Sequence, residues 1–277
     1  MSDVPTITLN NTVQIPQLGF GVFQVPPEET EHVVSTALEV GYRSIDTAAA
    51  YGNEEGVGRA IASSGLARDE VFVTTKLWNF DHGYAQALRA FEVSARRLGL
   101  DTVDLYLIHW PVPAADRYVE TWKALEKLAA DGRVRAVGVS NFNVEHLRRL
   151  FGETGTVPAV NQVELHPRFP QTELRRLHAA HGIATEAWSP LAQGGELLSD
   201  PTITRLADHH GVTPAQVVLR WHVQMGNIVI PKSVNPQRIR QNLDVFGFEL
   251  SAEDLAGIEE LDTGRRIGSD PATMNLR

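Results

Sequence analysis

Apolar segments typical of buried β-strands alternate with segments of helical periodicity eight times along the chain, and this alternation limits the possible folds more than any other feature. The expected strands cover residues 17–23, 44–48, 71–77, 103–110, 134–140, 159–165, 184–191 and 228–232. The helices expected after them cover residues 28–40, 54–64, 85–98, 118–131, 144–151, 172–181, the pair 201–210 and 214–225, and 236–245. Strands that are apolar on both sides and separated by helices predict a parallel sheet covered by helices.

Eight such units in 277 residues fit an α/β fold of the (β/α)8 TIM barrel type better than an open doubly wound sheet. Two segments fall outside the eight units. Residues 7–15 predict an N-terminal β-hairpin that turns at Asn10-Asn11 and closes the barrel floor. Residues 251–261 predict an extra C-terminal helix with Ser251 as its N-cap. Because no low-complexity linker divides the chain, we expect a single domain over residues 1–277.

The composition narrows the classes of partner and compartment. The formal net charge is -9 with a sequence pI of about 5.6, and a uniformly acidic surface repels phosphate backbones, so no nucleic-acid partner is expected. The chain has no cysteine, which excludes disulfides, thiolate metal sites and a cysteine nucleophile. We find no signal peptide and no apolar segment long enough to cross a bilayer, so we expect a cytoplasmic protein without a membrane partner.

Ionisable residues stand at the ends of three successive expected strands. The second strand ends at Asp46, the third at Lys76 and the fourth at His109, and Tyr51 follows the second strand closely. In a (β/α)8 barrel the chemistry takes place at this end of the strands. Each residue alone has an ordinary structural interpretation, such as a capping aspartate or a hydrogen-bonded core histidine. Four polar groups that converge beside apolar strands would be costly to bury without mutual pairing.

One chemistry uses all four groups. A free tyrosine has a pKa of roughly 10, too high for ready proton exchange near neutrality. A nearby ammonium favours the phenolate, so we predict that Lys76 lowers the pKa of Tyr51 and that Asp46 holds Lys76 in place. Tyr51 is then the general acid or base, and His109 polarises and orients a carbonyl oxygen. A proton donor beside a carbonyl also needs a hydride donor.

The last strand–helix unit, NIVIPKSVNPQRIRQN, predicts where an anionic cofactor binds. No G-x-G-x-x-G opens a helix after a strand, so the sequence does not support a Rossmann site. Asn235 is a suitable N-cap before Pro236, and Lys232, Ser233 and Arg238 flank the start of the helix. Basic residues beside a helix N-terminus predict an anion site in an otherwise acidic protein.

Motifs along nearly the whole chain resemble those of the aldo-keto reductase family. They are LGFGVF, GYRSIDTAAAYGNEEGVG, TTKLW, DLYLIHWP, VRAVGVSNF, VNQVELHP, WSPL and IPKSVNPQRIRQN. The chain is similar in particular to the bacterial branch that includes 2,5-diketo-D-gluconate reductase. The resemblance implies an NADPH-dependent oxidoreductase that reduces aldehydes or ketones, among them dicarbonyls or sugar-derived carbonyls, by direct hydride transfer. It also implies a small-molecule carbonyl substrate and a monomer.

The resemblance implies roles for residues that match the family's motifs. The catalytic set is Asp46, Tyr51, Lys76 and His109. The expected cofactor-binding residues are Ser140, Asn141 and Gln162 at the nicotinamide carboxamide, Trp188 stacked on the nicotinamide, Ser189, Pro190 and Leu191 under the pyrophosphate, and Lys232, Ser233, Val234, Arg238 and Asn242 at the adenosine and its 2'-phosphate. The expected substrate pocket is walled by Phe23, Ala49, Trp78, His109 and Trp110, together with Trp188.

One departure from the family and two alternatives stay open. Many members carry glutamate at the position of Gln241, where it steadies the adenine. A metal-dependent barrel hydrolase is one alternative, because Glu164 and His166 end the sixth strand, although we predict no metal site. The other is a non-enzymatic NADPH-binding regulatory protein. Arg265, Arg266 and Arg277 are interpreted as solvated charges of a short tail.

Overall fold

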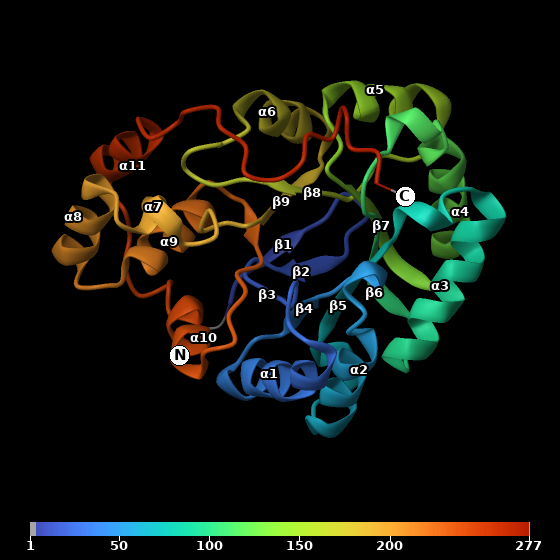
Figure 1. Ribbon diagram of the computed structural model, residues 1–277, viewed down its shortest axis with the longest axis horizontal. Coiled ribbons are helices and arrows are strands. Elements are labelled where there is room, and N and C mark those ends of the chain that lie inside the picture. The colour runs from blue at the N-terminus through green and yellow to red at the C-terminus, as the bar shows by residue number, and fades with distance from the viewer. Residues whose placement is uncertain (1–3, 277) are drawn as a thin grey trace.

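The computed structural model describes residues 4–276, and its centre is an eight-stranded parallel sheet that curls into a barrel (Figure 1). The strands are β3 (Phe20–Gly21), β4 (Ser44–Asp46), β5 (Phe72–Leu77), β6 (Val103–Ile108), β7 (Val134–Ser140), β8 (Val160–Glu164), β9 (Ala184–Trp188) and β10 (Ile228–Val229). Each strand pairs with the next one along the chain. A parallel bridge between Leu18 and Val229 joins the two edges, and the Gly19 amide donates to the Val229 carbonyl oxygen at 2.8 Å. The sheet therefore closes, and the predicted barrel is confirmed.

Helices surround the barrel as the outer layer (Figure 1). They are α1 (Pro27–Val40), α2 (Glu54–Ser63), α3 (Tyr84–Leu98), α4 (Tyr118–Ala130), α5 (Val144–Glu153), α6 (Thr172–His181), α7 (Gly195–Leu198), α8 (Pro201–His210), α9 (Pro214–Gln224), α10 (Pro236–Leu243) and α11 (Ala252–Glu259). All the predicted helices occur, and Ser251 caps α11 by accepting from the Asp254 amide at 3.1 Å. The short α7 was not predicted. No helix within residues 4–276 is long and apolar enough to span a bilayer.

The first and last strands of the barrel are shorter than predicted. Residues 17–23 and 228–232 were expected to be strands, but β3 and β10 each have two residues. Pro231 has no amide hydrogen to donate, so its carbonyl oxygen alone takes part, accepting from the Gly21 amide at 3.2 Å. The seam of the barrel is thus held by a few backbone bonds.

The N-terminal hairpin closes the barrel floor, as predicted. Its strands β1 (Thr6–Thr8) and β2 (Gln14–Pro16) pair antiparallel, and Leu9 and Ile15 join an apolar cluster with interior residues of the barrel strands. The chain turns at Asn10-Asn11, as predicted, and the Thr12 amide donates to the Leu9 carbonyl oxygen across the turn at 2.9 Å. Thr12 completes the loop in the left-handed conformation (φ 71°). The side-chain amides of Asn10 and Asn11 also bond the Pro158 and Arg135 carbonyl oxygens, at 3.1 and 2.9 Å.

The interior of the barrel changes character along its axis. Near the floor it is filled by Phe72, Leu105, Leu107, Val160 and their apolar neighbours. Toward the carboxyl ends of the strands the inward side chains become polar. After α11 the chain crosses this end of the barrel, which is its mouth, before it ends near α4 (Figure 1). The fold therefore places a polar layer between an apolar floor and a covering tail.

Candidate active site

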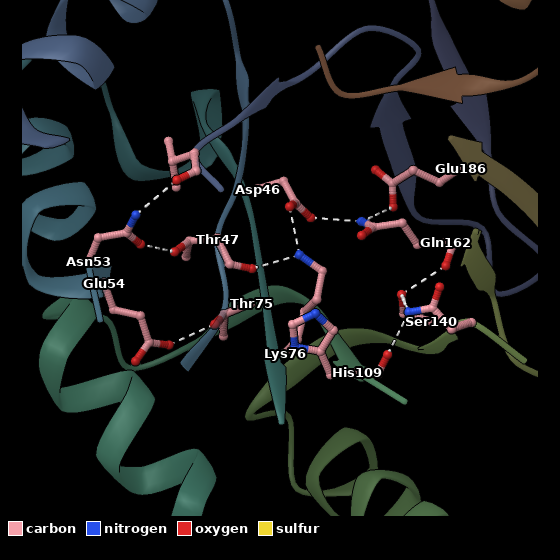
Figure 2. A network of polar contacts seen from close by, with 12 residues as sticks. Asp46, Thr47, Asn53, Glu54, Thr75, Lys76, His109, Ser140, Gln162 and Glu186 are labelled. Atoms are coloured by element: carbon pink, nitrogen blue, oxygen red, sulfur yellow. Dashed lines mark hydrogen bonds and ion pairs between the residues drawn. The ribbon is translucent and has the colours of Figure 1, made fainter. Parts of the chain in front are cut away.

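A buried ion pair connects two neighbouring strands at the barrel mouth. Asp46 is the last residue of β4, and Lys76 lies near the end of β5 with none of its surface exposed. The Lys76 ammonium lies 2.6 Å from Asp46 Oδ1 and donates a second hydrogen bond to the Thr47 carbonyl oxygen at 2.9 Å (Figure 2). Burial lowers the pKa of this lysine, but the charges of Asp46, Tyr51 and Glu186 and the hydrogen bond to Asp46 together more than offset burial, and the net pKa is raised. Lys76 is therefore a permanent cation at neutral pH.

Tyr51 lies against this cation. It ends the 3-10 helix η1 (Ala49–Tyr51), which follows β4, and Gly52 turns the chain away in the left-handed conformation (φ 69°). The Lys76 nitrogen lies 5.1 Å from the centre of the Tyr51 ring, and the His109 ring centre lies 5.7 Å from it. The structure therefore brings together all four residues that the strand ends predicted.

The net pKa of Tyr51 runs against the prediction from the sequence. Burial raises the pKa of the phenol, Lys76 lowers it by its charge and a hydrogen bond, and Asp46 raises it again. The net pKa is raised, because the free-energy cost of removing a phenolate from water exceeds the stabilisation that the Lys76 ammonium provides. That ammonium is already paired with Asp46. The expected direction of the Lys76 effect is right, but the net lowering is wrong. At neutral pH Tyr51 keeps its proton and can donate it.

His109 is neutral and presents one ring nitrogen to the site. Burial, and then the charge of Lys76, hold the pKa of His109 well below its usual range. Its Nδ1 atom is buried without a hydrogen-bond partner among residues 4–276, so a proton there would have no acceptor in that part of the chain. The neutral ring is therefore expected to carry its proton on Nε2, where it can donate to a carbonyl oxygen. Trp78 packs edge-on against this ring at 5.1 Å.

Four of the predicted nicotinamide residues also form one connected group. The Asn141 side chain donates to the His109 carbonyl oxygen at 2.9 Å and accepts from Trp188 Nε1 at 2.8 Å. Ser140 donates to the carbonyl oxygen of Gln162 at 2.8 Å. The Gln162 amide then reaches across the barrel to Asp46 Oδ2 at 2.8 Å (Figure 2). Through Gln162, the residues expected to bind the nicotinamide are thus hydrogen-bonded to Asp46, which holds Lys76 beside the proton donor.

The start of α10 carries the unpaired cations expected of a phosphate site. Within residues 4–276 the side chains of Lys232 and Arg238 are exposed and make no ion pair or hydrogen bond. Asn235 caps the helix as predicted, and its side chain accepts from the Gln237 and Arg238 amides at 2.9 and 3.1 Å. Because that cap already satisfies the first free amides, an anion here would depend on the side chains rather than on the helix terminus.

Comparison with known proteins identifies the family. The family model "Aldo/keto reductase family" matches residues 17–263. An aldo-keto reductase of Mycolicibacterium smegmatis is 61% identical over 272 residues, covering 98% of each chain. Methylglyoxal reductase DkgA of Yersinia pestis is 55% identical over the same length and coverage. The crystal structure of a Gox0644 mutant in complex with NADPH superposes with a TM-score of 0.96 at 52% identity, covering 99% of this chain and 100% of the other. The chain belongs to the aldo/keto reductase family.

In this aldo-keto reductase, two of the rings predicted for the substrate pocket, Phe23 and Trp78, pack against catalytic residues. Phe23 is 53% exposed, and its ring packs at 5.1 Å against Tyr51. Ala49 lies in the same 3-10 helix as Tyr51, and the half-buried Trp110 directly follows His109. The Phe23 and Trp78 rings therefore form a rim beside the Tyr51 hydroxyl and the His109 ring.

The C-terminal tail closes part of this rim, which the sequence did not predict. The Asn79 side chain donates to the Leu276 carbonyl oxygen at 2.7 Å. Gly268 lies so close to Trp188 that an added Cβ would stand 2.5 Å from the indole Cη2 atom. Arg266 is positioned over the Phe169 ring at 4.6 Å rather than freely solvated, and Arg277 lies outside the described residues.

Glu164 and His166, the pair behind the hydrolase alternative, attach this tail to the reductase. The buried Glu164 carboxylate accepts from the backbone amides of Ile267 and Gly268, at 2.5 and 2.8 Å, and contacts His166 Nε2 at 3.1 Å. Burial raises the pKa of Glu164, but these hydrogen bonds and the charge of His166 outweigh burial and leave the pKa lowered. The pair serves the tail, and neither alternative to the reductase finds support in the relatives.

A large surface cavity of about 1110 Å³ lies away from this site. It is lined by residues such as Arg68, Asp104 and Arg135, at the amino ends of the strands. Both arginines pair with Asp104, at 2.6 and 2.7 Å. Since both arginines are engaged by Asp104 and lie on the floor side of the barrel, the cavity has no part in the chemistry at the mouth.

The sequence interpretation missed one buried acid beside the catalytic groups. Glu186 is 1% exposed, and its Oε2 atom accepts from the Gln162 amide at 3.0 Å. The signal was present as a carboxylate in the middle of an apolar strand, ATEAW in β9. The alternation of side chains along a strand predicts which face of β9 carries Glu186. It does not identify the residue to which Glu186 is hydrogen-bonded.

Proposed function

We propose that this protein reduces small aldehydes and ketones, with reactive dicarbonyls foremost, to alcohols at the expense of NADPH. The observation that carries the proposal is the protonated Tyr51 beside a permanently charged Lys76 and a neutral His109. This set of groups can hold a carbonyl oxygen and protonate it as negative charge develops there. NADPH, when bound, supplies the hydride for the carbonyl carbon.

The roles of the four groups follow from their surroundings. His109 Nε2 donates a hydrogen bond that orients the carbonyl oxygen toward the Tyr51 hydroxyl. Tyr51 transfers its proton to that oxygen, and Lys76 stabilises the phenolate that is left. Asp46 keeps the ammonium from turning away. The buried ion pair thus matters after the proton has moved, when the tyrosine is negatively charged.

The residues expected to bind NADPH fit that cofactor in chemistry. Lys232 and Arg238 make no ion pair with any described residue, and these two cations beside Ser233 suit the 2'-phosphate. Gln162 presents its amide nitrogen to Asp46 and Glu186, so its oxygen is available for the carboxamide NH2. Trp188 is half-buried and suits stacking on the nicotinamide, while Ser140 and Asn141 stand beside it. Ser189, Pro190, Leu191, Val234 and Asn242 complete the expected binding surface.

Dicarbonyls of the methylglyoxal type are the proposed substrate class, because the relative from Yersinia pestis bears that activity in its name. A rim of aromatic rings, closed only in part by the tail, also suits small polar carbonyl compounds that need no charged group to bind them. We further propose a single-domain monomer that works in the cytoplasm. All four proposed catalytic groups come from one chain, and NADPH is an intracellular reductant.

A panel of carbonyl compounds tests the proposal, with NADPH consumption as the measurement. The panel holds methylglyoxal, a sugar-derived diketone and an aromatic aldehyde, and each is assayed with NADPH and with NADH. We expect methylglyoxal to be reduced and NADPH to be preferred. Binding of NADPH without consumption by any member of the panel would favour the regulatory alternative. Light scattering in the same buffer gives the mass of the particle and tests the monomer.

A further inference from the structure

We propose that Glu186 is a positioning residue for the reduction, which acts through the Gln162 amide on Asp46 and thereby on the Lys76–Tyr51 pair. The inference rests on the proposed carbonyl reduction and adds a residue to it. Glu186 does not touch the expected position of the carbonyl oxygen. It is connected to the catalytic groups through one hydrogen-bonded bridge.

The bridge is a single amide nitrogen shared by two carboxylates. Gln162 Nε2 lies 2.8 Å from Asp46 Oδ2 and 3.0 Å from Glu186 Oε2 (Figure 2). Both oxygens are acceptors, so the two acids together fix which end of the amide faces inward. The bond to Asp46 crosses from β8 to β4, which are opposite strands of the eight-stranded barrel. Glu186 therefore helps to hold Asp46 from the far side of the barrel.

Glu186, Gln162, Asp46 and Lys76 form one buried polar layer, and the net charge of this layer depends on whether Glu186 is ionised. The charged groups that face it are Asp46 from β4 and Lys76 from β5, while β8 contributes the neutral Gln162 and β10 the apolar Ile228 in register. One ammonium and one carboxylate balance each other. A second carboxylate leaves an unbalanced negative charge in a site closed to solvent.

This imbalance places the titration of Glu186 in the neutral range. Burial, and then the charge of Asp46, raise the pKa of Glu186 to about 7. The ionised form in turn raises the pKa of Tyr51. Protonation of Glu186 as the pH falls through this range thus makes Tyr51 a stronger acid. Its ionisation as the pH rises makes Tyr51 a weaker one.

The test is the pH profile of the reduction step for the wild type and for Glu186→Gln. Glutamine keeps the size of the side chain and an acceptor oxygen for Gln162, but it cannot ionise. Single-turnover reduction at saturating NADPH is measured from about pH 5.5 to about pH 9. The wild type should slow roughly threefold as the pH rises through about 7, the size expected when an acid catalyst weakens by a fraction of a pKa unit. Glu186→Gln should lack that step.

Glu54→Gln is the matched control. Glu54 is also a buried glutamate, but its Oε1 atom accepts from Thr75 at 2.6 Å and it lies on α2, outside the layer. Its variant should keep the wild-type profile. Glu186→Asp retains an ionisable group but withdraws it by one methylene from Gln162, so its step should persist at a shifted pH.

Two results would overturn the inference, and each differs from failure of the reductase proposal. One is a wild-type profile in Glu186→Gln. The other, which decides the matter if that variant does not fold, is a Glu186→Asp profile and NADPH affinity equal to those of the wild type. A wild type that reduces no carbonyl at any pH is instead the failure of the proposed function.

Discussion

Lys76 has no exposed surface, and its ammonium lies between the Asp46 carboxylate and the Thr47 carbonyl oxygen. A buried lysine without such partners would lose its proton near neutrality. Here the paired acid keeps the charge, and Tyr51 packs against it at 5.1 Å. The side chain that transfers the proton is thus distinct from the one that carries the permanent charge.

Tyr51→Phe tests the proton donor directly. The variant keeps the ring that packs against Phe23 and His109 but loses the hydroxyl. General acid catalysis contributes about 10²- to 10⁴-fold, so turnover should fall by at least about that factor. NADPH affinity, measured by quenching of protein fluorescence, should stay nearly unchanged. A variant with a third of the wild-type single-turnover rate would falsify the role.

The identity of these residues was predictable from the sequence, but their ionisation was not. Asp46, Lys76 and His109 end successive strands, and parallel strands in a barrel bring such ends together. The pKa of Tyr51 depends on how deeply the phenol is buried and on its distances from Lys76, Asp46 and Glu186, which the sequence does not provide. Glu186 escaped notice because its effect passes through Gln162.

At the scale of single elements, α10 gives the clearest prediction. Arg238→Ala should weaken NADPH binding at least about tenfold and NADH binding little, because one hydrogen bond to a charged group contributes roughly 1.5–3 kcal/mol and only NADPH has the 2'-phosphate. The loss should shrink at high salt, where the attraction is screened. Dissociation constants for both cofactors provide the measurement.

Arg240→Ala is the control for charge and helix content. Arg240 lies in the last turn of the same helix and is exposed, so its loss changes net charge equally without removing a group near the N-terminus. Equal losses for NADH and NADPH in Arg238→Ala, or an equal effect of Arg240→Ala, would sink the phosphate assignment.

Helices were easier to predict than the ends of strands. Thr213, Asn235 and Ser251 each accept a backbone hydrogen bond at a helix start, and this capping chemistry is local and therefore visible in sequence. The length of β3 and β10 depends on which backbone groups meet at the seam, where Pro231 ends the pairing. The hairpin turn at Asn10-Asn11 was also predictable, but the bonds of these side chains to the distant Pro158 and Arg135 carbonyl oxygens were not.

At the scale of the whole molecule, the contact between the C-terminal tail and the barrel mouth predicts that a substitution in the tail will alter activity. An added methyl at Gly268 would stand 2.5 Å from Trp188 and 3.0 Å from Glu164 Oε2, so Gly268→Ala must displace the tail or the indole. We expect kcat/KM for methylglyoxal to fall roughly tenfold, since small misplacements in a site are costly. Steady-state kinetics with fixed saturating NADPH measure it.

Gly247→Ala is the companion variant, because a Cβ there meets nothing within 4 Å. It should match the wild type in kcat/KM. If Gly268→Ala and Gly247→Ala behave alike, the tail is not a wall of the pocket. The path of the tail was not predictable, because it has no periodic pattern and is held by long-range bonds to Glu164 and Asn79.

The attachment of the tail has an evolutionary consequence. Glu164 holds it through the main-chain amides of Ile267 and Gly268, which are present whatever side chain stands at position 267. Mutations in the tail can therefore reshape the outer wall of the pocket without detaching it, and the catalytic layer below need not change. Substrate range can drift quickly in such a lineage, while the chemistry of reduction is inherited intact.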